Sequence, residues 1–143
     1  MKVKQISIFL ENKQGHLLEV VDALAKAKVN IRALSIADTS EFGILRIIVP
    51  DPELAKKALK KGGFTFNEND VIAVGVSDTP GGLASALRVL AQGGINVEYL
   101  YAFVSKSDEK AVVVLKTDNL NDSIKLLKKA GIGILPPKEV YSL

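Results

Sequence analysis

The sequence contains no cysteine and no tryptophan, and it has one histidine and one methionine among 143 residues. The absence of cysteine excludes disulfide bonds and thiolate metal sites. A single histidine, His16, is too few for a zinc site, so we expect neither a metal nor a cofactor. Phosphate-binding glycine motifs of the Walker or dinucleotide kind are absent as well. The sequence therefore gives no sign of metal or nucleotide chemistry.

Long apolar runs are also missing. The run from Ile6 to Leu10 is interrupted by Ser7 and is too short for a secretion signal. No segment is long enough and apolar enough to cross a bilayer as a helix. We therefore expect a cytoplasmic protein that does not act at a membrane.

Arginine is scarce, so lysine supplies most of the 19 basic residues, which face 16 acidic ones. The lysines cluster at helical spacing, largely opposite apolar residues. This pattern predicts solvated helix faces rather than a nucleic-acid surface. The clustered residues are Lys56, Lys57, Lys60, Lys61, Lys125, Lys128 and Lys129.

The chain carries an internal repeat, in which residues 6–37 align with residues 72–103 without a gap. The matched pairs include Gly15 with Gly81, Leu17 with Leu83, and Asn30 with Asn96. A repeat of this length is typical of a duplicated small domain. We predict two domains, residues 1–69 and 70–143. Domains of this size are marginally stable alone, so each should pack against its sister or another chain.

Each copy has the pattern strand, helix, strand, strand, helix, strand. Alternating apolar residues from Ile6 to Leu10 predict the first strand, and an apolar stripe at helical spacing follows Gly15. Asp51 and Pro52 predict the start of the second helix. Two βαβ units that share one antiparallel sheet make a ferredoxin-like sandwich. The predicted fold class is therefore α/β (α+β), with two βαββαβ sandwiches in tandem.

The predicted strand at residues 97–104 carries an apolar and aromatic row, which consists of Val97, Tyr99, Tyr101 and Phe103. The alternating residues Leu100 and Ala102 should face the helices, so the row should face away from them. A sheet that is apolar on both faces is covered on both. We predict that the row is buried against the sister copy or a second subunit.

The C-terminal segment, residues 139–143, looks like the start of a third copy, because Val140 falls where Ile72 opens the second. Pro136 and Pro137 break the chain just before it. We predict that this segment adds a strand to the edge of a sheet.

Combinations of residues that would indicate catalysis are absent. Ser77 and Ser85 have no candidate base in their own copy, and His16 has no cysteine near it. The loops after the first strand of each copy contain no arginine, which acylphosphatase-like chemistry on this fold would need. We predict that the protein is not an enzyme.

The best candidate site in each copy is the loop between its first strand and first helix. The loops read Asn12-Lys13-Gln14-Gly15-His16-Leu17 and Asp78-Thr79-Pro80-Gly81-Gly82-Leu83. Glycine allows backbone N–H groups to approach a carboxylate at the positive end of the helix. In a single copy, a tight turn with Asn12 or Asp78 as a helix cap would explain the loop better. Because both copies carry it, we favour ligand binding.

An asparagine follows the first helix of both copies, at Asn30 and Asn96. Either residue could be a left-handed turn residue, a conformation that asparagine tolerates. Alternatively, its amide could contact both the amine and the carboxylate of a ligand in a neighbouring loop. The sequence alone leaves both interpretations open.

These motifs resemble those of the ACT domain, an amino-acid-sensing regulatory module. The second copy matches the family's loop motif well, whereas the first has Gln14 in place of the usual proline. The resemblance covers nearly the whole chain, as a tandem pair without an attached enzyme domain. It implies that an amino acid lies at the interface between two modules, held by the loop backbone and the asparagine. The implied ligand-binding residues are Asn12, Gln14, Gly15, His16, Leu17, Asn30, Asp78, Pro80, Gly81, Gly82, Leu83 and Asn96.

The resemblance also implies a function. It indicates a non-catalytic, allosteric protein that binds a small-molecule amino acid, modulates an enzyme of amino-acid metabolism and forms a homo-oligomer such as a dimer. One alternative within this class is a regulatory subunit of acetolactate synthase. An alternative of a different class is RNA binding, because RNA-recognition motifs share this topology and stack bases on sheet aromatics. Nucleic-acid binding is less favoured, because the first copy has Ala33, Ser35 and Ala37 where the second has its aromatic residues.

Overall fold

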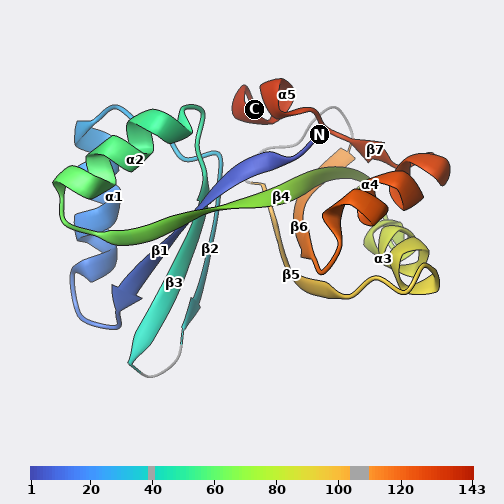
Figure 1. Ribbon diagram of the computed structural model, residues 1–143, viewed down its shortest axis with the longest axis horizontal. Helices are drawn as coiled ribbons and strands as arrows, with labels where there is room; N and C mark the ends of the chain where they lie inside the picture. Colours follow the sequence, from blue (N-terminus) through green and yellow to red (C-terminus); the bar gives the residue numbers. More distant parts are fainter. Residues whose placement is uncertain (39–40, 104–109) are drawn as a thin grey trace. The chain divides into compact units, whose positions relative to one another are not determined.

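The repeat in the sequence reappears as two structural units of the same topology (Figure 1). The computed structural model describes residues 1–38, 41–103 and 110–143. The first unit consists of Lys4–Asn69, and the second consists of Asp70–Leu143 together with Met1–Val3. Strand β4 belongs to both units, because it runs without interruption from Thr65 to Ser77.

The first unit has two helices and a sheet with the strand order β2-β3-β1-β4. Strand β3 pairs antiparallel with both β1 and β2. The elements are β1 (Val3–Glu11), α1 (His16–Lys26), β2 (Ala33–Asp38), β3 (Phe42–Ile48), α2 (Pro52–Lys61) and the first part of β4 (Thr65–Ser77). Strand β2 is the edge of this sheet.

The second unit repeats this arrangement with the strand order β7-β4-β6-β5 and antiparallel pairing throughout. Its further elements are α3 (Gly82–Gln92), β5 (Val97–Ala102), β6 (Lys110–Thr117), α4 (Leu120–Lys129), β7 (Gly133–Ile134) and α5 (Pro137–Tyr141). The predicted fold class, two ferredoxin-like βαββαβ sandwiches with antiparallel sheets, is confirmed. Residue 104, the expected end of the strand at 97–104, lies outside the described residues.

The second helix of each unit starts at a side-chain cap. The backbone N–H of Leu54 donates to Asp51 Oδ1 at 3.1 Å, and Pro52 is the first residue of α2, as predicted. Asn119 caps α4 in the same way, because its Oδ1 accepts from Asp122 N at 3.0 Å. A cap of this kind contributes about 1 kcal/mol to stability.

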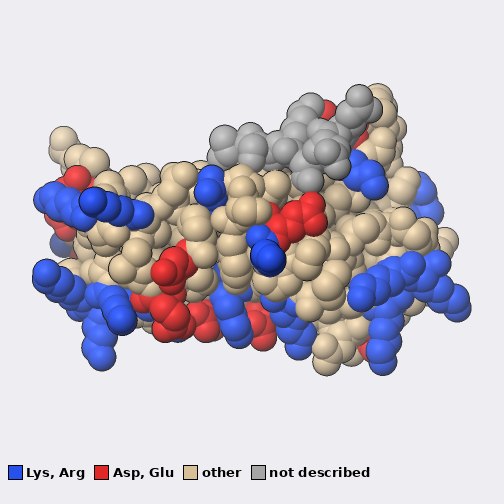
Figure 2. All heavy atoms as spheres, turned by 90° about the horizontal axis from the view of Figure 1, so that it is seen from above, with Lys and Arg blue, Asp and Glu red and all other residues tan. Residues whose placement is uncertain are grey.

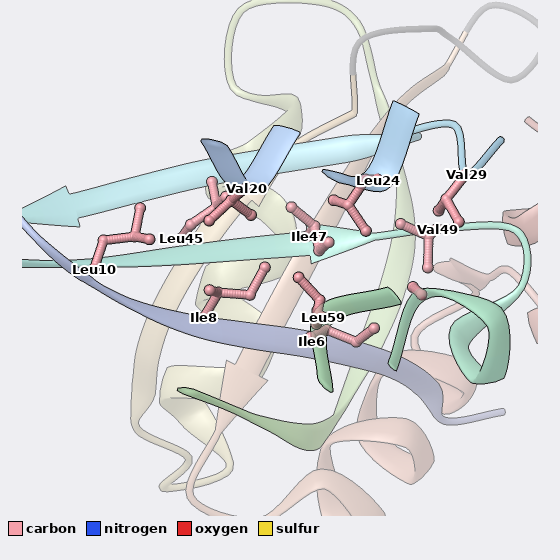
Figure 3. Packing of buried hydrophobic residues seen from close by; sticks show 11 residues of the cluster. Ile6, Ile8, Leu10, Val20, Leu24, Val29, Leu45, Ile47, Val49 and Leu59 are labelled. Carbon is pink, nitrogen blue, oxygen red and sulfur yellow. The ribbon is translucent and has the colours of Figure 1, made fainter. Parts of the chain in front are cut away.

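Each unit has its own apolar core between helices and sheet. The first core contains Ile6, Ile8, Leu10, Val20, Leu24, Val29, Leu45, Ile47, Val49, Ala55 and Leu59 (Figure 3). The second contains Ile72, Val74, Val76, Ala86, Leu90, Val113, Leu115, Leu127 and Ile134. Even-numbered residues of β1 and β4 supply the strand side of these cores, which agrees with the alternation in the sequence.

A β-bulge changes one of the predicted faces in β5. Val97 lies opposite Thr117 and Tyr99 lies opposite Lys116, so two steps along β5 match one step along β6. Val97 therefore packs against the helix-side core. The prediction that it shares a face with Tyr99 was wrong, because the extra residue of a bulge reverses the alternation.

The aromatic residues further along β5 lie on the predicted face. Leu100 lies opposite Leu115 of the helix-side core, so Tyr101 faces away from the helices. Tyr101 and Phe103 are only 7% and 8% exposed. Tyr99 of the same row is only half-buried, so the predicted burial holds for Tyr101 and Phe103 alone. Buried rings cannot stack on bases, and the burial of these two argues against the RNA-binding alternative.

The C-terminal segment forms a helix, so the prediction of an extra strand was wrong. Pro137 is the first residue of α5, a position where its missing N–H is not needed. The N–H of Val140 donates to Pro136 O at 3.1 Å. The side chain of Val140 is fully buried.

Removing residues 138–143 should lower the free energy of unfolding, because it deletes the buried Val140 side chain. Burial of a valine contributes about 1.5–3 kcal/mol. Urea unfolding measures the loss. Val140→Ala should show a smaller loss of the same sign, and the exposed Lys138→Ala should be neutral. An unchanged unfolding midpoint in the shortened chain would show that α5 contributes nothing.

The lysine clusters lie mostly on exposed helix surface, as predicted, and Lys57, Lys60 and Lys61 are all exposed. Figure 2 shows basic side chains projecting from the surface with acidic side chains among them. Lys56 differs, because its Nζ lies 2.7 Å from Glu53 Oε1 and 3.0 Å from Glu68 Oε2. These hydrogen bonds, the one to Glu53 foremost, raise the pKa of Lys56.

Candidate functional site

The two candidate loops share one backbone feature. Gly15 and Gly81 are the N-cap residues of α1 and α3, and both have a φ of 85°, in the left-handed region that favours glycine. Neither of these two described helices has a side-chain cap. The interpretation of Asn12 and Asp78 as helix caps is therefore not supported.

The loops differ one residue further along. In the second loop, a Cβ at Gly82 would lie 1.9 Å from the carbonyl oxygen of Ser77, so only glycine fits there. In the first loop, the residue equivalent to Gly82 is His16, so this position accommodates a side chain. The carbonyl oxygen of Glu11, equivalent to that of Ser77, accepts a hydrogen bond from Lys13 N at 2.8 Å. The second loop is thus packed more tightly onto the end of its strand.

Gly82→Ala should destabilise the protein by about 1–3 kcal/mol, because the new Cβ forces the backbone of the second loop to move. Urea unfolding measures this cost. The matched control is His16→Ala, at a position that already carries a side chain, and we expect a change within about 0.5 kcal/mol. Equal losses in both variants would contradict the difference between the loops.

A cavity of about 140 Å³ lies beside the first loop. It is lined by Leu10, Glu11, Asn12, Lys13, Leu17, Ile36 and Gly43. The end of β1, the loop, the first turn of α1 and the edge strand β2 thus meet here. Of the predicted site residues, Asn12 and Leu17 contribute to the lining, whereas Gln14, Gly15 and His16 belong to the loop without lining the cavity.

The cavity beside the second loop has a different position. It measures about 230 Å³, and Gly82 is the predicted site residue that lines it. Its lining also includes Ser85 of α3, Lys110 of β6, and Gly131, Ile132 and Gly133 in and just before β7. No residue of the edge strand β5 lines it. Asp78, Pro80, Gly81 and Leu83 are near it in sequence but do not line it.

The two asparagines lie away from the loop of their own unit. Asn30 follows the C-terminal end of α1, whereas the loop precedes its N-terminal end, and a helix of 11 residues is roughly 16 Å long. Asn96 has the same relation to α3. Asn30 Oδ1 accepts from Ile31 N at 2.9 Å, and Asn96 N donates to Asp118 Oδ1 at 3.1 Å. The structure therefore does not bring either asparagine to the loop of the same unit.

Comparison with protein families identifies the chain. The family model for the ACT domain pair matches residues 1–138. The chain belongs to the ACT domain pair family. A comparison with curated proteins found no match to the sequence.

Solved structures similar to this ACT pair agree with that assignment. Protein BT0572 from Bacteroides thetaiotaomicron is 43% identical, with a TM-score of 0.93 over 100% of this chain and 98% of that one. The regulatory subunit of aspartate kinase from Thermus thermophilus is 18% identical, with a TM-score of 0.61 over 89% and 91%. The aspartokinase alpha and beta subunits are 19% identical, with a TM-score of 0.57 over 89% and 92%. The last two share the fold with this chain.

Glu11 and Lys13 form an ion pair in the first loop of the ACT pair, with 2.5 Å between Lys13 Nζ and Glu11 Oε2. The hydrogen bond from Lys13, assisted by its charge, lowers the pKa of the Glu11 carboxyl, and Glu11 in turn raises the pKa of Lys13. Both shifts favour the charged forms, so the pair persists through neutral pH and is lost in acid as Glu11 becomes protonated.

Several residues that line the first cavity were not among the predicted site residues. Leu10, Glu11 and Ile36 meet there because β1 and β2 both pair with β3. The charges of Glu11 and Lys13 on either side of Asn12 were the one signal in the sequence that could have indicated them.

No helix in the described ranges of the ACT pair is long and apolar enough to cross a membrane. The same residues contain no cluster of potential metal ligands.

Proposed function

We propose that this ACT domain pair is a non-catalytic regulatory protein that binds a small-molecule amino acid and modulates an enzyme of amino-acid metabolism. The observation that carries the proposal is the glycine-capped helix start, without a side-chain cap, in both units. N–H groups at the positive end of a helix bind carboxylates, and every amino acid has one. In this proposal the domains, residues 1–69 and 70–143, provide one such loop each.

The position of the asparagines supports a site made by more than one domain. Asn30 and Asn96 lie at the far end of α1 and α3 from the loops of their own units. An asparagine amide can accept from an ammonium and donate to a carboxylate. We infer that each loop is completed by the asparagine of another domain, so that the amino acid bridges the two.

A second copy of the chain is the partner that we propose for this bridging. Among the described strands, β2 is the edge of the first unit's sheet, and its side chains Leu34 and Ile36 are 44% and 50% exposed. Leu17 on α1, beside the same cavity, is 41% exposed. An apolar edge of this kind invites strand pairing, and a homodimer would cover it.

Regulation follows if the ligand binds one arrangement of the domains better than another. A ligand shifts an equilibrium only by its difference in affinity for the two states. An amino acid that bridges two domains meets this condition, because it binds fully only when both domains are in place. A partner enzyme that contacts the dimer would then respond to the concentration of the amino acid.

A thermal-shift screen over the common L-amino acids tests the proposal. A ligand present at about 100 times its Kd adds about 2.7 kcal/mol to the stability of the folded state. For a chain of this length that is an increase of about 10 °C in Tm. The D-enantiomer of the best ligand is the control and should give little shift. If no L-amino acid raises Tm, the proposed function is wrong.

A further inference from the structure

The rim of the first cavity carries two opposite charges that touch each other. Glu11 and Lys13 both line this cavity of about 140 Å³, and they form the 2.5 Å ion pair of the first loop. Their side chains are 50% and 64% exposed. Since water screens an exposed pair of this kind, its separation costs little free energy.

The second loop has a neutral pair at the same two positions. Ser77 and Thr79, which match Glu11 and Lys13 in the repeat, share a hydrogen bond of 3.0 Å between their hydroxyl groups. Both loops thus bring together the side chains of the last strand residue and the residue two positions later. Only the first unit places a carboxylate and an ammonium group there.

We propose that the Glu11–Lys13 pair opens around the zwitterionic backbone of an amino acid in the first cavity. Glu11 then accepts hydrogen bonds from the α-ammonium group of the ligand, and Lys13 donates to its α-carboxylate. The exchange conserves charge pairing, because one exposed ion pair is replaced by two charge-assisted hydrogen-bonded pairs. This inference rests on the proposed function, since it names the recognition groups and the ligand class of the same site.

The rest of the lining selects a small aliphatic side chain. Leu10, Leu17 and Ile36 provide apolar surface, and apart from Glu11 and Lys13 no described residue that lines the cavity is charged. With the ion pair engaged by the ligand backbone, a charged ligand side chain would have no partner. The volume of about 140 Å³ is below the roughly 300–1,000 Å³ of sites for larger ligands, which favours a small side chain.

The test follows the backbone amide signals of residues 11–17 by NMR in the full chain, because these signals report the first unit separately from the second. L-valine is the probe, together with 3-methylbutanoate, which lacks the ammonium group, and isobutylamine, which lacks the carboxylate. We expect L-valine to bind at least about tenfold more tightly than either analogue, since each analogue loses one charged hydrogen bond. Raising the salt concentration should weaken the binding.

Glu11→Gln and Lys13→Gln should each weaken L-valine binding at residues 11–17 by about tenfold. The double variant Glu11→Ser with Lys13→Thr gives the first loop the neutral pair of the second and should lose the salt dependence. The control is Asp22→Asn with Lys26→Gln, which removes another exposed ion pair, 3.0 Å long, within α1. This control should bind L-valine as the unaltered chain does.

The outcomes separate the inference from the proposed function. If an amino acid binds at the first loop but the Glu11 and Lys13 variants bind it equally well, the inference is overturned and the proposed function stands. Tighter binding of a charged or aromatic amino acid than of L-valine overturns the ligand class. If none of the common amino acids moves these signals or raises Tm, the proposed function fails, and the inference fails with it.

Discussion

Replacing Asn96 with leucine will abolish amino-acid binding at the loop that Asn96 completes, while the fold survives. Asn96 is exposed, and its backbone makes two hydrogen bonds that leucine keeps: its N–H donates to Asp118 Oδ1, and its C=O accepts from Asp118 N. The substitution removes an amide that we expect to bond both the ammonium and the carboxylate of the ligand. Two hydrogen bonds to charged groups account for a loss of at least about 100-fold in affinity.

Calorimetric titration with the best ligand measures this loss, and Tm without ligand reports the fold. Asn121→Leu, at an exposed position of α4, is the matched control and should bind normally. Gly81→Leu provides a second variant, because it puts a bulky side chain into the open space beside the loop, at a backbone φ of 85°. That strain costs about 1–2 kcal/mol, which the fold should survive. Normal binding by both Asn96→Leu and Gly81→Leu would show that the site assignment is wrong.

Replacing Tyr101 with serine will destabilise the protein by about 3–5 kcal/mol, the usual cost of deleting a buried aromatic ring. Tyr101 is 7% exposed and lies opposite Val114 in the sheet of the second unit. Its neighbour Ala102 is exposed and faces the other side, so Ala102→Ser is the matched control. Urea unfolding compares the two. A Tyr101→Ser chain as stable as the control would show that the aromatic residues of β5 are not part of a core.

The strands and helices could be predicted from the sequence because their signals are local. The alternation from Ile6 to Leu10 places one face of β1 in the core, and Asp51 caps α2 where the sequence indicated. The bulge in β5 left no such signal. Val97 and Tyr99 are both large and apolar, so the alternation looks regular although the register shifts between them.

The C-terminal helix was missed for a different reason. The repeat placed Val140 at a position equivalent to the start of a strand, yet a strand needs a free partner edge, which no local pattern reveals. The physical signal was Pro137, since proline favours the first turn of a helix. For this segment, the preference of proline for a helix start indicated the structure better than the alignment of the two copies did.

The candidate loops were visible in the sequence, whereas the shape of the cavity was not. Asn12 and Leu17 could be selected because glycine marks the turn between them. Ile36 reaches the same cavity only because β2 pairs with β3 beside β1. Contacts of this kind depend on strand register, which is a property of the folded sheet rather than of a short motif.

Strand β4 fixes which residues face inward in both units, because one continuous strand runs through them. Its 13 residues join the two units without a linker, and even-numbered residues face the helices on both sides of the join. Phe66 packs on the first core, and Ile72 and Val74 belong to the second. Because side chains alternate along a strand, one residue inserted between Asn69 and Asp70 would exchange the inward and outward residues of one unit relative to the other. A single residue added at the join would therefore need a β-bulge such as the one in β5, whereas two added residues would keep the alternation of both units.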